Sequence, residues 1–253
     1  MEVQAQERQY HNLPTYFKWL GSQLKGWPQQ NYYLFWFSLG LQIMTLVSNP
    51  ITPVAIITFI GTTLGVTCIL SINAAKSVNG WLGLLSAACY IYAGWTAKNY
   101  LSIFEQVAYI VTLDLPVLLA TKTWNEETVN NLRKFGAKQW VVAIIGTLVV
   151  YGVSGWAIGA FTNDPRPWID ALSFAVSLTA GIMCFMRYNN QYFWWAASGI
   201  FQLVLWGITF HQGDATLAMA INSSVYVVNV ILAFTVSPWF NHGRNKAGLS
   251  KIK

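Results

Sequence analysis

The chain has 253 residues, of which 55% are hydrophobic and only 9% are charged, whereas soluble domains carry about 25% charged residues. No charged residue occurs between Lys25 and Lys76, or between Asp214 and Arg244. Apolar stretches of about 20 residues are long enough to cross a bilayer. The composition therefore excludes a soluble protein and predicts an all-α polytopic membrane protein.

Aromatic residues and lysines mix early in the chain, in residues 16–27 (YFKWLGSQLKGW). Such a mixture is typical of a segment that lies at the membrane surface. Eight apolar stretches follow and predict eight transmembrane helices, at residues 32–48, 53–71, 80–97, 100–120, 139–161, 168–186, 192–211 and 215–240.

The positive charges support this count. With eight helices, all but two of the 15 lysines and arginines fall on one side of the membrane, and only Lys98 and Arg166 fall on the other. Cytoplasmic segments carry the excess of positive charge, so both termini are predicted to be cytoplasmic. Topology and attraction to anionic membrane lipid account for the net charge of +6 without nucleic-acid binding.

The order of the helices suggests two repeats. Helices two to four and six to eight begin on the same side, so the fifth could connect two parallel three-helix bundles, with the first as an extra helix. The predicted divisions are an interfacial segment 1–30, the additional helix 31–50, a first bundle 51–120, a cytoplasmic loop 121–138, a linker helix 139–165, a second bundle 166–240 and a basic cytoplasmic tail 241–253.

One face of each of the last two predicted helices carries amides and aromatic rings. These residues are Trp195, Gly199, Gln202 and Trp206 on the first, and Asn222, Tyr226 and Asn229 on the second. An antiparallel pair would place Gln202 opposite Asn222 at matched depth. Amides in lipid are costly unless partnered, so the pattern predicts an aromatic and amide cleft near mid-membrane, or simply amides that join the helices.

Two acids lie within the predicted helix 100–120. Intramembrane acids commonly mark proton relays or cation sites. Glu105 is near the start of the helix, where it is expected to be solvated at the outer interface. Asp114, two residues before Pro116, is a candidate for ion coupling, although it could instead bond backbone groups at a proline kink.

Other polar residues complete the candidate site. Gln106 is expected to reach a central cavity. Asn73, Tyr188, Asn190 and Gln191 lie at inner helix ends, as candidate gates or as ordinary interface residues. No catalytic motif or set of metal ligands occurs in the sequence, so neither an enzyme nor a cofactor nor a metal is predicted.

Three segments carry a resemblance: GWLGLLSAACYIYAGW (80–95), YFWWAASGIFQLVLW (192–206) and NSSVYVVN (222–229). With them, the chain resembles the PnuC family of bacterial nicotinamide riboside transporters, which are similar in fold to the sugar-transporting SWEETs. Tyr192 and Trp195 stand where that family is expected to have Trp-x-x-Trp, and Gly199 stands where an acid or amide is expected. The first helix is additional to a seven-helix member.

The resemblance implies facilitated diffusion by alternating access across the bacterial inner membrane, with phosphorylation trapping the vitamin B3 precursor for NAD biosynthesis. It also implies a homotrimer. Rings would stack on the pyridinium and amides would bond its carboxamide and ribose hydroxyls; these residues would be Gln106, Trp195, Gln202, Trp206, Asn222, Tyr226 and Asn229. The cleft has no lysine or arginine, which favours a nucleoside over a nucleotide.

Other functions remain open from the sequence. The chain could carry a sugar or another nucleoside, or couple transport to protons. A sensory receptor or a structural scaffold are further alternatives, although a retinal receptor would need a lysine in the last helix, and residues 215–240 contain none.

Overall fold

A computed structural model describes residues 13–119, 133–188 and 190–236 of the chain. Within these ranges the secondary structure is helical, with no β-strand, as predicted. The helices are α2 (Leu13–Ser22), α3 (Gln29–Val47), α4 (Pro53–Asn73), α5 (Asn79–Thr96), α6 (Tyr100–Tyr109), η1 (Ile110–Asp114), α7 (Leu115–Leu119), α9 (Ala137–Phe161), α10 (Pro167–Phe185), α11 (Gln191–His211) and α12 (Leu217–Val236). Most of the predicted loop 121–138 and all of the tail 241–253 lie outside the described residues.

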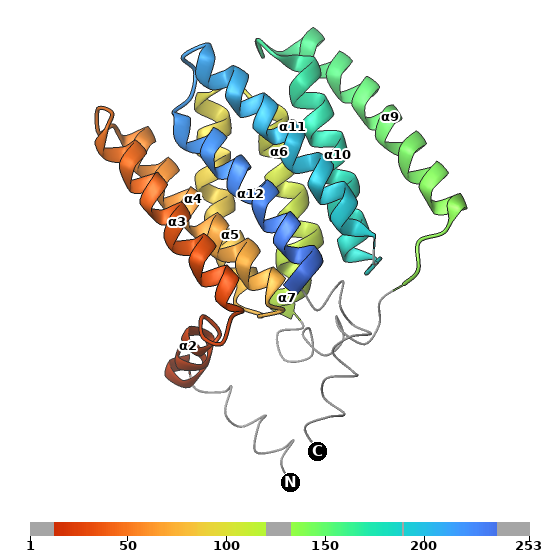
Figure 1. The fold of residues 1–253 in the computed structure, drawn as a ribbon. Helices are drawn as coiled ribbons and strands as arrows, with labels where there is room; N and C mark the ends of the chain where they lie inside the picture. The colour runs from red at the N-terminus through yellow and green to blue at the C-terminus, as the bar shows by residue number, and fades with distance from the viewer. Residues whose placement is uncertain (1–12, 120–132, 189, 237–253) are drawn as a thin grey trace.

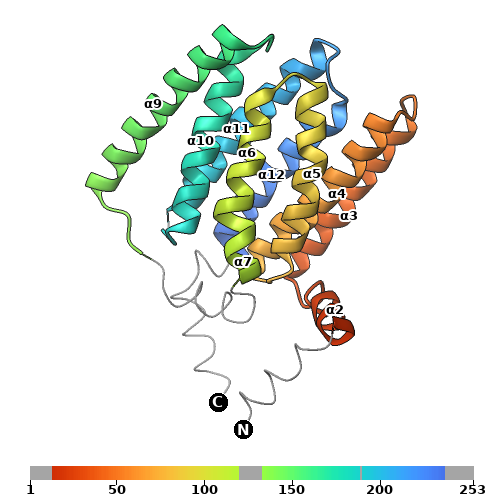
Figure 2. The same ribbon diagram turned by 180° about the vertical axis from the view of Figure 1, so that it is seen from behind.

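Six helices form a closed ring. In order around the ring, α4 packs on α5, α5 on α6, α6 on α10, α10 on α11, α11 on α12, and α12 again on α4. Outside the ring, α3 packs on α4 and α12, and α9 packs on α10, so that α3 and α9 stand at opposite edges of the molecule (Figures 1 and 2). The last two helices are therefore neighbours, as the cleft prediction requires.

Six of the described helical segments are long and apolar enough to cross a membrane, namely α4, the α6–η1–α7 segment, α9, α10, α11 and α12. Helices α3 and α5, with 19 and 18 residues, run alongside them (Figure 1). The helix limits agree closely with the predicted ones: α3 begins at residue 29 instead of 32, and α12 is described to residue 236, whereas the predicted end at 240 lies outside the described residues.

Four helix hairpins share one turn geometry. After α4, α5, α10 and α11, a residue with positive φ is followed by an N–H that bonds to a carbonyl five residues back. The left-handed residues are Ala75, Lys98, Arg187 and Gly213. This is the closure that satisfies the last carbonyls of a helix. It recurs at equivalent places in α4–α5–α6 and α10–α11–α12, so the two triplets share their connections.

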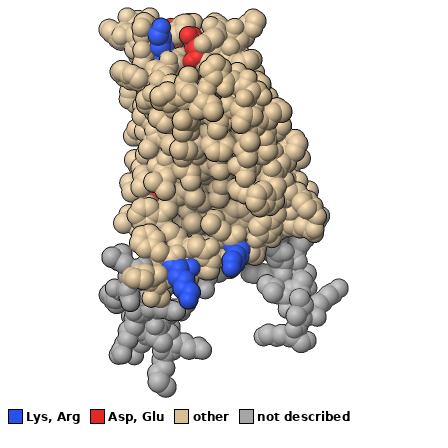
Figure 3. Space-filling view, turned by 90° about the vertical axis from the view of Figure 1, so that its left-hand side faces the viewer, with Lys and Arg blue, Asp and Glu red and all other residues tan. Residues whose placement is uncertain are grey.

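The outside of the bundle is apolar. Figure 3 shows a broad belt almost without charged residues between charged groups at its two ends. Large apolar side chains project from this belt, among them Trp36, Val142 and Trp156, each more than 60% exposed. Because only lipid accommodates such a surface, the belt marks the membrane-facing part of the chain.

Helix α2 lies beyond the end of the bundle below α3 (Figure 1). The indole N–H of Trp81 in α5 donates to the Tyr16 hydroxyl at 2.8 Å and ties α2 to the bundle. The predicted interfacial segment thus includes a helix, which ends at Ser22.

The segment before Pro116 is wound more widely than an α-helix. Proline has no N–H to donate, and here the N–H of Leu115 bonds to the carbonyl of Ile110, closing a π-turn over Ile110–Asp114. Such turns bend helices and often occur at functional sites. The turn directs Asp114 toward α5, where its carboxylate packs against Gly83.

Candidate functional site

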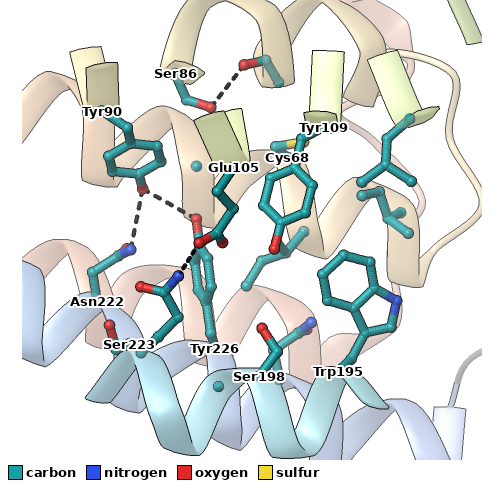
Figure 4. A pocket seen from close by; sticks show the side chains of 18 of the residues that line it. Cys68, Ser86, Tyr90, Glu105, Tyr109, Trp195, Ser198, Asn222, Ser223 and Tyr226 are labelled. Atoms are coloured by element: carbon teal, nitrogen blue, oxygen red, sulfur yellow. Dashed lines mark hydrogen bonds between the residues drawn. The ribbon is translucent and has the colours of Figure 1, made fainter. Parts of the chain in front are cut away.

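The helix ring encloses a cavity of about 160 Å³. A single water needs only about 10–15 Å³ by such a measure, so the space can hold more than isolated water. Side chains from all six helices of the ring line it, and none comes from α3 or α9. Figure 4 shows tyrosine, tryptophan, amide and carboxyl groups converging on this space.

All seven residues predicted to contact a substrate line this cavity, although they come from three separate helices. They are Gln106 from α6, Trp195, Gln202 and Trp206 from α11, and Asn222, Tyr226 and Asn229 from α12. The structure therefore brings the predicted group together around one space.

The amides of α11 and α12 that were predicted to lie opposite each other have hydrogen-bond partners on other helices. Asn222 bonds to the Tyr90 hydroxyl of α5 at 3.1 Å, not to Gln202. Tyr90 in turn bonds to the Tyr226 hydroxyl at 3.1 Å (Figure 4). Gly65 makes room for this pair, because a Cβ there would lie 2.2 Å from the Tyr90 hydroxyl.

Tyr90 was not predicted as a site residue. It lies in the middle of the segment GWLGLLSAACYIYAGW, among apolar residues of α5, and reaches the cavity from the opposite side of the ring. The sequence signal that could have found it is a tyrosine hydroxyl near the middle of an apolar helix, where it needs a hydrogen-bond partner.

Glu105 was predicted to be solvated at the outer interface, and this prediction is wrong. The residue is 2% exposed and directed into the cavity. The Gln202 amide donates to its carboxylate at 2.5 Å, and the Gln202 carbonyl accepts from the Trp206 indole at 2.9 Å. Both ends of Gln202 are thus occupied, and α11 holds the carboxylate of α6 in place. The cavity is therefore not the uncharged space that the amide pattern suggested.

Two of the aromatic rings that line the cavity, those of Tyr109 and Trp195, lie together on one side of Glu105 (Figure 4). Tyr109, one helical turn beyond it, packs against Trp195 with ring centroids 5.6 Å apart. Figure 4 shows both rings projecting toward the cavity. Two adjoining aromatic faces beside a carboxylate can hold a flat cationic ring.

At one end of the cavity, amides from three helices converge. Asn73 of α4 donates toward the carbonyl oxygens of Asn31 and Asn229, each at 3.4 Å. Gln191 also lines this end, and its carbonyl accepts from the Trp195 indole at 3.4 Å. Among the candidate gates, Asn73 and Gln191 therefore adjoin the cavity.

The two other candidate gates lie farther from the cavity. Tyr188 packs edge to face on Phe135, with centroids 5.0 Å apart, and is outside the cavity lining. Asn190 is the residue before α11 and makes no side-chain cap. Both therefore occupy the loop between α10 and α11.

The opposite end of the cavity is closed by Arg166, from the loop between α9 and α10. Its guanidinium donates to Asn99 at 3.0 Å, to the Ala97 carbonyl at 2.5 Å, to Asp214 at 2.8 Å and to Gln212. One buried side chain thereby joins the α5–α6 and α11–α12 turns. The sequence identified Arg166 only as a charge at this end.

Asp170 forms a second tie between the triplets at this end. Its carboxylate accepts from the Leu101 N–H at 2.8 Å and from the Ser102 hydroxyl at 3.2 Å. It therefore caps α6 from the neighbouring helix α10. Within the described residues, no three side chains of His, Cys, Asp or Glu are grouped as metal ligands would be.

Apolar helices in a ring around a polar cavity, with two similarly connected triplets, form the architecture of a membrane transporter that binds its solute between two halves. A family model described as "Nicotinamide mononucleotide transporter" matches residues 55–241. The chain belongs to this family of transporters, which are not enzymes.

Two curated relatives are each called nicotinamide riboside transporter PnuC. The protein from Neisseria mucosa is 22% identical over 227 residues, covering 85% of this chain and 83% of the relative. The protein from Haemophilus influenzae is 24% identical over 225 residues, covering 83% and 90%. These matches confirm the resemblance to the PnuC family that the sequence indicated.

A solved structure shares the fold. The crystal structure of the vitamin B3 transporter PnuC aligns with a TM-score of 0.73 at 19% identity, covering 90% of this chain and 98% of that one. This alignment covers more of the chain than residues 55–241, the part that the family model matches. The shared fold therefore includes most of the described chain.

Proposed function

We propose that this chain carries nicotinamide riboside across the inner membrane of a bacterium. The names of both curated relatives support this substrate. The single observation that carries the choice is the charge of the cavity: its described lining contains Glu105 and Asp114 but no lysine or arginine. A phosphate is normally bound by such cations, so the cavity suits the cationic nucleoside better than its anionic mononucleotide.

The site offers groups for each part of the substrate. The pyridinium would stack on Trp195 and Tyr109, an interaction worth about 0.5–2 kcal/mol. Two buried amide atoms at the cavity lack partners among the described residues, the carbonyl oxygen of Asn222 and the Nε2 of Gln191. An acceptor and a donor of this kind would pair with ribose hydroxyls or the carboxamide.

The proposed topology has eight transmembrane helices, two parallel three-helix bundles (α4–α5–α6 and α10–α11–α12), α9 as the linker and α3 as the additional helix. Both termini would be cytoplasmic, because Lys98 and Arg166 lie in turns at one end of α5 and α10, whereas Lys76 and Arg187 lie in turns at the other end of the same helices. The Arg166 end then faces outward. A trimer remains an expectation from the resemblance.

Transport would proceed by alternating access, with the bundles rocking about the cavity. The ties of Arg166 and Asp170 hold the outer end shut in this conformation, so an outward-open state must break them. Facilitated diffusion would equilibrate the nucleoside, and cytoplasmic phosphorylation would trap it for NAD biosynthesis. Proton coupling through Asp114 is the second candidate, favoured by a carboxyl group that is 4% exposed and lines the cavity.

The test is uptake of labelled nicotinamide riboside by liposomes that contain only the purified protein. Without a kinase or an ion gradient, label should reach the same concentration inside and outside, and excess unlabelled nicotinamide mononucleotide should compete weakly. Strict dependence on a proton gradient would reject uncoupled transport and favour coupling, with Asp114→Asn as the variant that loses it. Absence of uptake under every gradient would reject the proposed substrate.

A further inference from the structure

The cavity contains two buried acidic side chains, and its described lining has no positive residue to balance them. Glu105 and Asp114 are 2% and 4% exposed, and the described lining has no lysine or arginine. The nearest buried guanidinium, that of Arg166, is committed to the turns at the outer end. Burying a carboxylate among neutral groups is costly, so a positively charged ligand would relieve a cost that is built into the site.

Glu105 is the better placed of the two acids. The bond from Gln202, itself fixed by Trp206, holds the carboxylate toward the middle of the cavity (Figure 4). Asp114 instead packs at the wall, where a Cβ on Gly83 would lie 2.0 Å from its Oδ1. The first carboxylate faces the space that a ligand would fill, and the second is held between α5 and η1.

The surroundings of Glu105 also indicate a ligand. The carbonyl oxygen of Asn222, in a side chain 4% exposed, faces the same cavity without a hydrogen-bond partner among the described residues. Tyr109 and Trp195 present aromatic faces beside the carboxylate. A carboxylate, an unpaired amide oxygen and π-faces attract positive charge together, and none of them favours an anion.

We propose that Glu105 determines charge specificity: it provides the counter-charge that selects nucleosides whose base is a permanent cation over uncharged nucleosides of the same shape. This proposal rests on the proposed function, since it concerns how the same cavity recognises its substrate. The amide residues then fix the orientation of the sugar and carboxamide, and Gln202 is a positioning residue for Glu105.

The test compares two ligands that differ in charge. Nicotinamide riboside carries a pyridinium cation, and its dihydro form has nearly the same shape with an uncharged ring. Binding of both is measured by calorimetry on the purified wild-type protein, on Glu105→Gln and on Asp114→Asn. Glu105→Gln keeps the size and a carbonyl that can accept from Gln202 but removes the charge, whereas Asp114→Asn removes an equal charge from the cavity wall.

The wild type should bind the cation at least tenfold more tightly than the dihydro form. In Glu105→Gln that preference should fall by about tenfold or more, through weaker binding of the cation, while affinity for the dihydro form stays within about twofold. Unchanged binding of the dihydro form also shows that the variant is folded. In Asp114→Asn the preference should persist.

Four results would overturn the proposal. An undiminished preference in Glu105→Gln, or an equal loss for both ligands, would show that the carboxylate has no charge role or only a structural one. Collapse of the preference in Asp114→Asn alone would assign the role to the other acid. A wild type that binds neither ligand would reject the proposed function itself, and this proposal with it.

Discussion

Removal of Arg166 should open the end of the cavity that is proposed to face outward. Arg166→Ala deletes donors to Ala97, Asn99, Gln212 and Asp214. A hydrogen bond contributes about 0.5–1.5 kcal/mol net, and the ion pair is worth about 1 kcal/mol at most because Asp214 is 35% exposed. In the open state, water replaces some of these hydrogen bonds. We therefore expect the variant's closed state to be less stable by about 2 kcal/mol relative to the open state, which is about a 30-fold shift in the ratio of open to closed protein.

A native cysteine can report this opening. Cys68 of α4 lines the cavity near its inner end, and replacing Cys89 and Cys184 by serine leaves it as the chain's single thiol. In intact cells, a membrane-impermeant maleimide should label Cys68 about 30-fold faster in Arg166→Ala than in the parent, as long as opening limits the reaction.

The matched control is Lys98→Ala, which removes the same charge from the same end of the molecule. Lys98 is exposed, so its loss should leave the labelling rate unchanged. A rise of less than about threefold in Arg166→Ala, or an equal rise in Lys98→Ala, would refute the closing role of Arg166. The thermal midpoint of each variant separates local opening from general loss of structure.

Three further predictions concern the interior. Gly65→Ala places a methyl group 2.2 Å from the Tyr90 hydroxyl, so it should weaken nicotinamide riboside binding by at least about tenfold; unaltered calorimetric affinity would contradict this placement. Asp170→Asn weakens the cap on the Leu101 N–H and should destabilise the protein by about 1 kcal/mol, seen as a lower thermal midpoint with affinity retained. Asn222→Leu removes a partner of Tyr90 and an unpaired acceptor, so the calorimetric affinity for nicotinamide riboside should fall about tenfold.

The helices could be predicted from the sequence because lipid imposes one rule on the backbone. Every N–H and C=O within the membrane must bond internally, so each long apolar stretch becomes a helix. The predicted ranges for α4, α9 and α11 accordingly differ from the observed ones by no more than two residues at either end. The spacing of Trp195, Gln202 and Trp206 placed them on one face for the same reason.

The neighbours of each polar side chain could not be predicted in this way. Helices that are apolar all round do not show which face points inward, so Glu105 was expected at the interface although it lies in the cavity. Gln202 and Asn222 occupy the expected faces, yet they bond to Glu105 and Tyr90 because four other helices complete the ring.

The sequence by itself determined a membrane-embedded bundle, the limits of its helices and the set of amides and rings that share a cavity. These follow from hydrophobicity and from helical periodicity, which act along the chain. The tertiary structure alone decided that a carboxylate faces that cavity and that Arg166 closes one end. Both depend on how helices far apart in the chain are rotated and packed, since a buried charge is defined by the groups around it.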